Sequence, residues 1–256
     1  MSIIALRDKV AIVTGSAVGI GREIALAYGR EGAKVVVNFS KSVEEADETA
    51  RLVTATGAEA IVVQADVTVA EQAQRLIDTA VARFGRLDVL VNNAGATRFV
   101  DFSDLDGLTE EVWDSLFAVN VKGAFWCARA AAKVMQAQPE GGAIINIVSQ
   151  AGLRPAGSSI AYCVAKAGEV HLTLCLAKAL GPAIRVNAIA PGFIAETRWN
   201  VGRPNLAAAQ AAAANAALLK RVGYPADIAE AAVFLGGAGA YVTGHVLVVD
   251  GGRIWA

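Results

Sequence analysis

The chain has 256 residues, of which 55% are hydrophobic and 18% charged, so it can bury a substantial core and lacks the composition of a disordered protein. Its net charge of -1, from 23 basic and 24 acidic residues, gives no indication of the basic surface typical of nucleic-acid binders or of polybasic proteins at membrane surfaces. Three cysteines without CxxC spacing predict neither a disulfide framework nor a metal site, and they favour a cytoplasmic protein. No apolar run reaches the roughly 18 residues of a membrane span, so no membrane partner is expected.

The first elements predict a βαβ unit with a glycine-rich turn. An apolar run at Val10–Val13 predicts a strand, and an amphipathic pattern over residues 22–31 predicts the helix that follows. Between them lie Gly15, Gly19 and Gly21, and glycines here let backbone N–H groups approach a pyrophosphate at the helix N-terminus. Because this turn follows a strand and precedes a helix, it predicts dinucleotide binding.

Strands and helices continue to alternate along the chain. Further strands are predicted at residues 35–37, 60–64, 87–91, 143–148, 185–189 and 245–249. Further helices are predicted at residues 43–56, 70–84, 109–137, 159–180 and 226–235. Strands that are apolar on both faces indicate a parallel sheet covered by helices on both sides. The expected fold is therefore α/β, a doubly wound sheet of about seven strands in a single domain over residues 1–256.

Small and polar residues follow the ends of the predicted strands. Ligands of doubly wound sheets bind beyond the carboxyl ends of the strands, so we expect these residues to share one site. They are Thr14 and Gly15, Asp66, Asn92 to Gly95, Ser149, and Pro191 with Gly192.

The segment 149–166 carries a serine hydroxyl, a tyrosine phenol and a lysine ammonium. Tyr162 and Lys166 are four residues apart, so on a helix they share one face. A cation held there favours the phenolate and lowers the tyrosine pKa from about 10 toward neutrality. Tyr162 would then be a usable acid or base near pH 7. Tyr-x-x-x-Lys also arises by chance in many helices, so the rest of the chain decides its meaning.

Together these motifs resemble the short-chain dehydrogenase/reductase family over essentially the whole chain. The matching pieces are TGSAVGIG (14–21), Asp66-Val67, NNAG (92–95), Asn120 within VNVKG, Ser149, YCVAK (162–166) and PGFIAET (191–197). The resemblance implies a Rossmann-type fold, a nicotinamide cofactor and the interconversion of a carbonyl and a secondary alcohol.

The resemblance also implies a catalytic tetrad of Asn120, Ser149, Tyr162 and Lys166. Tyr162 would exchange a proton with the substrate oxygen, which Ser149 would orient. Lys166 would bind the hydroxyls of the nicotinamide ribose and lower the pKa of Tyr162. Asn120 would hold a water that links Lys166 to solvent.

The cofactor would lie along the glycine-rich turn, the next strand ends and the segment after Pro191. The implied residues are Thr14, Gly15, Ser16, Gly19, Ile20, Gly21, Asn38, Phe39, Ser40, Lys41, Asp66, Val67, Asn93, Ala94, Gly95, Tyr162, Lys166, Pro191, Gly192, Ile194 and Thr197. Asp66 would bond the adenine ring, and a helix N-cap is its alternative role.

The end of the second strand bears on the choice of nicotinamide. NAD-specific sites usually place a carboxylate there, and in this chain Phe39 stands in its place. Ser40 and Lys41 could bond and neutralise a 2′-phosphate. We therefore expect NADP(H). NAD(H) stays open because many NADP-preferring relatives carry a basic residue at the position of Val18.

The substrate is less well defined by the sequence. The predicted contacts are Gln150, Arg154, Phe193 and Trp199, with a helical lid at about 193–217. The resemblance is to 3-oxoacyl-[acyl carrier protein] reductase-like members, which implies an NADPH-dependent reductase of 3-oxoacyl thioesters or of ketones in general. A sugar, polyol or small-alcohol dehydrogenase is the alternative. A cofactor-sensing protein without catalysis is more remote, because Tyr162 and Lys166 are both present.

Two further expectations concern partners. Acyl carrier protein is acidic, and Arg129 and Lys133 could dock it, whereas Glu140 in the loop QAQPEGG weakens that interpretation. Members of the family are commonly homotetramers, so the resemblance implies this assembly.

Overall fold

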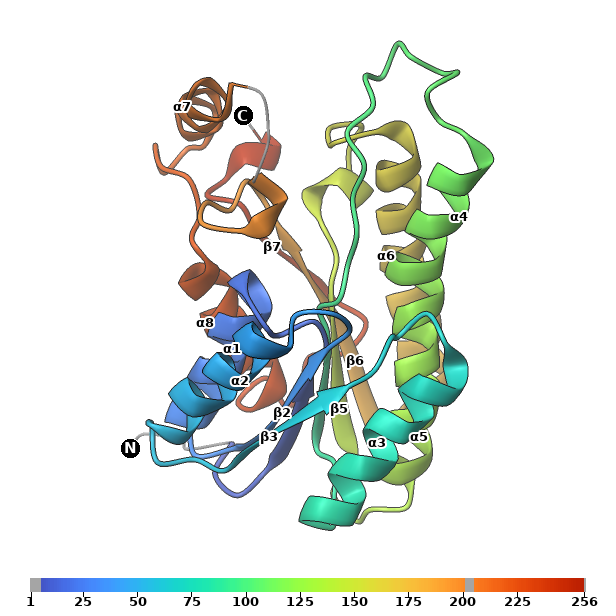
Figure 1. The fold of residues 1–256 in the computed structure, drawn as a ribbon, viewed down its shortest axis with the longest axis vertical. Coiled ribbons are helices and arrows are strands. Elements are labelled where there is room, and N and C mark those ends of the chain that lie inside the picture. The colour runs from blue at the N-terminus through green and yellow to red at the C-terminus, as the bar shows by residue number, and fades with distance from the viewer. Residues whose placement is uncertain (1–5, 201–204, 256) are drawn as a thin grey trace.

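The computed structural model describes residues 6–200 and 205–255, and its seven strands form one parallel sheet (Figure 1). The strand order is β3-β2-β1-β4-β5-β6-β7. The strands are β1 (Val10–Val13), β2 (Lys34–Phe39), β3 (Ala60–Gln64), β4 (Val89–Asn92), β5 (Gly142–Ile147), β6 (Ile184–Pro191) and β7 (Val246–Val249). The predicted fold class is thus confirmed. The order reverses between β1 and β4, which is where doubly wound sheets bind ligands.

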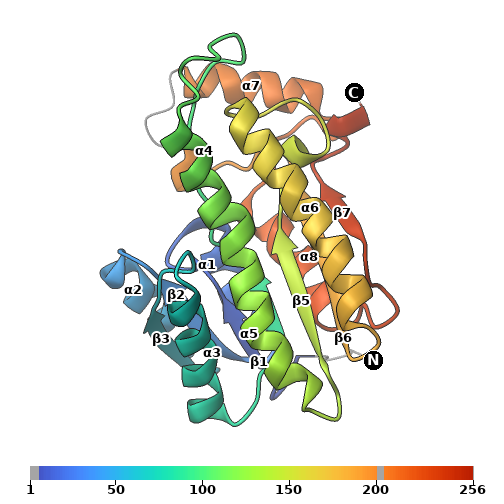
Figure 2. The ribbon, with the colours of Figure 1, turned by 90° about the vertical axis from the view of Figure 1, so that its right-hand side faces the viewer.

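Helices cover both faces of the sheet (Figures 1 and 2). On one face lie α1 (Gly19–Arg30), α2 (Val43–Thr54) and α8 (Pro225–Gly236). On the other lie α3 (Ala70–Phe84), α5 (Ala124–Gln136) and α6 (Ile160–Leu180), and α4 (Glu110–Phe117) continues the line of α5. The helix α7 (Leu206–Ala216) lies across the end of the molecule at which α6 begins.

The strands are apolar throughout because both faces of the sheet are buried. Successive side chains of a strand point to opposite faces. In β1, Ala11 and Val13 join the core on the α1 and α8 side, while Val10 and Ile12 join the core on the α3 and α5 side. All four are at most 1% exposed. This double burial produces the continuous apolar runs seen in the sequence.

The single helix predicted over residues 109–137 is wrong in its middle. A π-helical turn, η1 (Ala118–Gly123), separates α4 from α5. The Asn120 side chain donates to the carbonyl of Leu116 at 2.9 Å, which is the carbonyl that the Asn120 backbone N–H would use in a regular α-helix. A side chain inserted into this ladder accounts for the wider turn.

Among the described residues, α6 is the one helix whose length and composition would suit a membrane span. A single helix of this kind is weak evidence, since core helices pass the same test. In this fold Ala161, Ala165 and Leu176 of α6 are buried, and we interpret α6 as a core helix.

Candidate active site

A cavity of about 1030 Å³ lies at the carboxyl ends of the strands. Its wall includes the glycine-rich turn, the ends of β4 and β5, the first turns of α6 and part of α7. The predicted residues that line it are Gly15, Gly19, Ile20, Gly21, Asn38, Ser40, Lys41, Asp66, Val67, Asn93, Ala94, Gly95, Ser149, Gln150, Tyr162, Lys166, Pro191, Gly192, Phe193, Ile194, Thr197 and Trp199. The structure therefore gathers residues from both halves of the chain into one site.

The glycine-rich turn has the geometry that an anion-binding turn requires. Gly15 and Gly19 have φ angles of 60° and 61°, in the left-handed region that favours glycine. A Cβ on Gly21 would lie 2.8 Å from the Gly15 carbonyl oxygen and would also contact the Asn93 amide. The first N–H groups of α1 have no side-chain cap, and Gly19 to Gly21 line the cavity. This turn fits the pyrophosphate of a dinucleotide.

Thr14, Ser16 and Asn120 lie behind the cavity wall instead of in it. The Thr14 hydroxyl accepts from the backbone N–H groups of Asn93 and Ala94 at 2.9 and 3.0 Å, which joins the glycine-rich turn to the end of β4. The Ser16 hydroxyl donates to the Val13 carbonyl at 2.7 Å. These side chains hold the backbone of the site and do not line it.

Asn120 is fully buried, and its side chain clamps the segment after β4. Its amide donates to the Ala96 carbonyl at 3.0 Å and accepts from the Ala96 N–H at 3.2 Å. The water relay implied for Asn120 stays a prediction.

Two predicted contacts are corrected by the structure. Phe39 is 7% exposed and packs in the core on the α1 and α8 side, so its side chain does not reach the cavity, while Ser40 and Lys41 do. Arg154 does not line the cavity either, because its guanidinium donates to Gln150 Oε1 and to the Arg253 carbonyl at 3.1 and 3.3 Å.

Asp66 lines the cavity and is not the N-cap of α3, whose N-cap is Val69. Its carboxylate accepts from the backbone N–H and the hydroxyl of Thr68 at 2.9 and 2.7 Å. This local turn fixes the carboxylate at the end of β3.

The start of α6 places Tyr162. Ser159 is the N-cap, and its hydroxyl accepts from the Tyr162 N–H at 3.2 Å. Tyr162 is 6% exposed, and its ring meets that of Trp199 edge-on, with centroids 5.4 Å apart. Ser149 follows β5 and accepts from the Ala151 N–H at 3.1 Å.

The pKa of Tyr162 is raised above its ordinary value. Burial is the main cause, a hydrogen bond with Ser149 lowers the pKa in part, and the charge of Glu169 raises it further. The predicted lowering of the Tyr162 pKa by Lys166 is therefore wrong when only groups of this chain surround the phenol. The main physical reason is the burial of Tyr162, and a buried carboxylate that is paired with Lys166 acts in the same direction.

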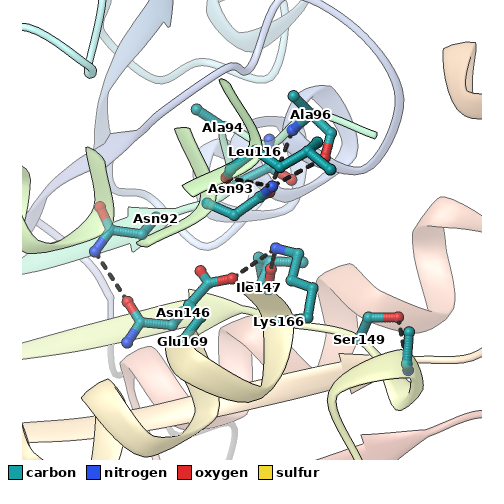
Figure 3. Close-up of polar contacts among 12 residues, drawn as sticks. Asn92, Asn93, Ala94, Ala96, Leu116, Asn146, Ile147, Ser149, Lys166 and Glu169 are labelled. Atoms are coloured by element: carbon teal, nitrogen blue, oxygen red, sulfur yellow. Dashed lines mark hydrogen bonds and ion pairs between the residues drawn. The ribbon is translucent and has the colours of Figure 1, made fainter. Parts of the chain in front are cut away.

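That carboxylate is Glu169, which is absent from the residues predicted from the sequence motifs. Lys166 Nζ donates to Glu169 Oε2 at 2.6 Å and to the Ile147 carbonyl at 2.9 Å (Figure 3). The two side chains are 3% and 1% exposed. Burial raises the pKa of Glu169 to about 7, although Lys166 lowers it. The spacing of three residues on one helix face could have revealed the pair.

Aromatic side chains besides that of Tyr162 also line the cavity. Phe99 and Phe102 line it together with the predicted Phe193 and Trp199, whereas Arg98 is exposed and does not. Ala209 and Ala212 of α7 line it from the region of the predicted lid, of which residues 201–204 lie outside the described part. Arg253 was also missed, because nothing in the sequence brings the segment after β7 to the cavity.

Among the described residues, no group of three or more histidine, cysteine or acidic side chains could hold a metal ion. Cys127, Cys163 and Cys175 are free.

Comparisons with known proteins agree with this geometry. A family model described as enoyl-(acyl carrier protein) reductase matches residues 15–253. A protein described as the second candidate ketoacyl reductase of the granaticin polyketide synthase of Streptomyces violaceoruber is 46% identical, over 95% of each chain. A 3-oxoacyl-[acyl-carrier-protein] reductase of a Synechocystis strain is 41% identical over 98% of each chain.

A solved structure gives the same result for the fold. The crystal structure of a short-chain type dehydrogenase/reductase from Mycobacterium marinum superposes with a TM-score of 0.87 at 32% identity, covering 98% of this chain and 97% of that one. With the family model and the relatives, this likeness shows that the chain belongs to the short-chain dehydrogenase/reductase family and is an NAD(P)-dependent enzyme acting on CH–OH and C=O groups.

Proposed function

We propose that the enzyme is an NADPH-dependent reductase of 3-oxoacyl thioesters or related ketones. The observation that carries the proposal is the position of Tyr162 in one cavity with the glycine-rich turn and with Trp199, Phe99 and Phe102. Aromatic walls suit an acyl chain or a ring better than a sugar, whose hydroxyls need many hydrogen-bonding partners. The names of the two relatives point to the same substrate class.

The catalytic roles follow from the contacts. When bound, the nicotinamide supplies the hydride that reduces the carbonyl carbon. The Tyr162 phenol donates its proton to the carbonyl oxygen, and the Ser149 hydroxyl, which bonds Tyr162, orients that oxygen. Lys166 carries the positive charge beside the tyrosine. In the reverse direction Tyr162 accepts the proton of the alcohol.

A substrate screen tests this function. We expect NADPH oxidation with 3-oxoacyl thioesters and aryl ketones, followed by absorbance, with kcat/KM rising as the acyl chain lengthens toward the aromatic walls. Aldohexoses and polyols serve as the competing class. A higher kcat/KM for a sugar or polyol than for any thioester or ketone would contradict the proposal.

The preference for NADPH rests on Lys41, an exposed cation that lines the cavity after β2. We predict that Lys41→Ala lowers kcat/KM for NADPH about tenfold, because one charged contact to the 2′-phosphate is lost, while kcat/KM for NADH stays within about twofold. Lys178→Ala removes the same charge from an exposed position in the last turn of α6 and should change neither value. Equal losses of kcat/KM with NADPH and with NADH would show that Lys41 does not contact the 2′-phosphate.

Partners and assembly complete the proposal. Arg129 and Lys133 are exposed on α5 and could meet an acidic carrier protein, and Glu140 does not oppose this because it is paired with Lys9 and Arg86. Val164 and Leu174 are exposed apolar residues of α6, which suits burial in a homotetramer. We place the enzyme in the cytoplasm, where its free cysteines would stay reduced. We also propose that α7 acts as the lid.

A further inference from the structure

The active site contains a buried carboxylate that the catalytic roles above do not use. Glu169 lies one turn after Lys166 on α6 and is 1% exposed (Figure 3). A buried carboxylate is costly unless it is paired, and a buried pair is weak evidence for stability alone. Its position beside a proposed catalytic lysine therefore calls for a functional explanation.

The surroundings of Glu169 isolate its interaction with Lys166. On α6, the charge of Glu169 raises the pKa of Tyr162, and its carboxylate pairs with Lys166. Among the described residues, Lys166 is the one charged group that shifts the pKa of Glu169. From β5 come a carbonyl, that of Ile147, and the neutral amide of Asn146. The Thr173 hydroxyl donates to the Glu169 backbone carbonyl and accepts from Asn146, both at 2.9 Å.

The ammonium of Lys166 has three protons to donate. Glu169 and the Ile147 carbonyl take two of them, and Lys166 lines the cavity, so one proton remains for a group bound there. The carboxylate thus fixes where the ammonium sits. It also adds a negative charge that opposes formation of the Tyr162 phenolate.

We propose that Glu169 is a positioning residue that anchors the Lys166 ammonium and thereby sets the pH range in which Tyr162 exchanges its proton. The inference rests on the proposed function, in which Tyr162 is the acid and base. It adds that the positive charge of Lys166 beside Tyr162 is balanced by the negative charge of Glu169.

The test is the pH profile of alcohol oxidation by Glu169→Gln. Oxidation needs the phenolate, so kcat/KM for a secondary alcohol with NADP⁺ rises with pH as Tyr162 loses its proton. Glutamine keeps the shape and removes the negative charge, which favours the phenolate. We expect the rising limb to move to lower pH by about one unit. Glu169→Asp keeps the charge farther from Lys166 and should give a smaller shift in the same direction.

Thr173→Val is the matched control. It removes the hydroxyl that holds the Glu169 backbone and leaves the carboxylate in place, so it should lower stability without moving the profile. An unchanged profile in both Glu169 variants, or an equal shift in Thr173→Val, would overturn the inference. If Glu169→Gln does not fold, Glu169→Asp decides alone.

A second readout needs no turnover. The pKa of Glu169 rises from 4.5 to about 7 on folding. A raised pKa contributes stability that is present below pH 4.5 and is lost as pH rises through 7. The free energy of unfolding of the wild type should therefore fall relative to that of Glu169→Gln between these values, while Thr173→Val keeps the wild-type trend. Absence of carbonyl turnover in the wild type would instead contradict the proposed function.

Discussion

Replacing Tyr162 with phenylalanine is expected to lower kcat for carbonyl reduction about 1,000-fold, because the proton donor is removed from the reaction. Phenylalanine keeps the ring that meets Trp199 edge-on. Ser149 keeps its hydrogen bond with the Ala151 N–H. The loss of one hydroxyl therefore costs only about 1 kcal/mol of stability, and the effect on kcat is separable from unfolding.

The measurement combines kcat at saturating substrate with a cofactor titration and a thermal unfolding midpoint. Tyr241→Phe is the matched control, since Tyr241 is fully exposed and does not line the cavity, and it should behave as the wild type. A Tyr162→Phe enzyme that binds NADPH normally and reduces carbonyls at the wild-type rate would show that another group donates the proton.

The fold is predictable from the sequence because burial of both faces of the sheet makes its strands continuous apolar runs. Val10–Val13 is apolar at every position because helices lie above and below it, and the strand predicted there coincides with β1. Gly85 ends α3 with a φ of 78°, a conformation that glycine adopts without strain, so the helix end could also be read. Such signals depend on neighbouring residues, so they can be recognised in a single sequence.

Errors arise where a contact depends on residues distant in sequence. The predicted second strand ended at Val37, whereas β2 continues to Phe39. Alternation along that longer strand places Phe39 on the same face as Val35 and Val37, in the core. In the π-helical turn, the Asn120 side chain bonds Ala96 as well as Leu116, and no helix periodicity encodes the contact with Ala96.

The tyrosine pKa was mispredicted for a related reason. The spacing of Tyr162 and Lys166 shows that they share a helix face, and it says nothing of what neutralises the lysine. Glu169 carries the missing charge, and its effect depends on its burial beside Lys166. Charge balance in a buried site is therefore a property of packing, which a motif does not contain.

Replacing Gly21 with alanine is expected to lower kcat/KM about 100-fold, mainly by weakening cofactor binding. The added Cβ would meet the Gly15 carbonyl oxygen at 2.8 Å and the Asn93 amide closer still. Asn93 cannot withdraw freely, because its amide donates to the carbonyls of Thr14 and Gly15 at 2.9 and 3.1 Å. Each bond contributes about 1 kcal/mol, so the turn has to shift or lose them.

The same substitution at Gly168 is the control. Gly168 is a helical residue of α6, two positions after Lys166, and a Cβ there would meet only Val121 at an ordinary 3.6 Å. Gly168→Ala should keep wild-type cofactor affinity and gain about 1 kcal/mol of helix stability at most. Fluorescence titration with NADPH measures the cofactor affinity of both variants directly. Unchanged affinity in Gly21→Ala would mean that the close approach of this turn to Asn93 is not what holds the cofactor.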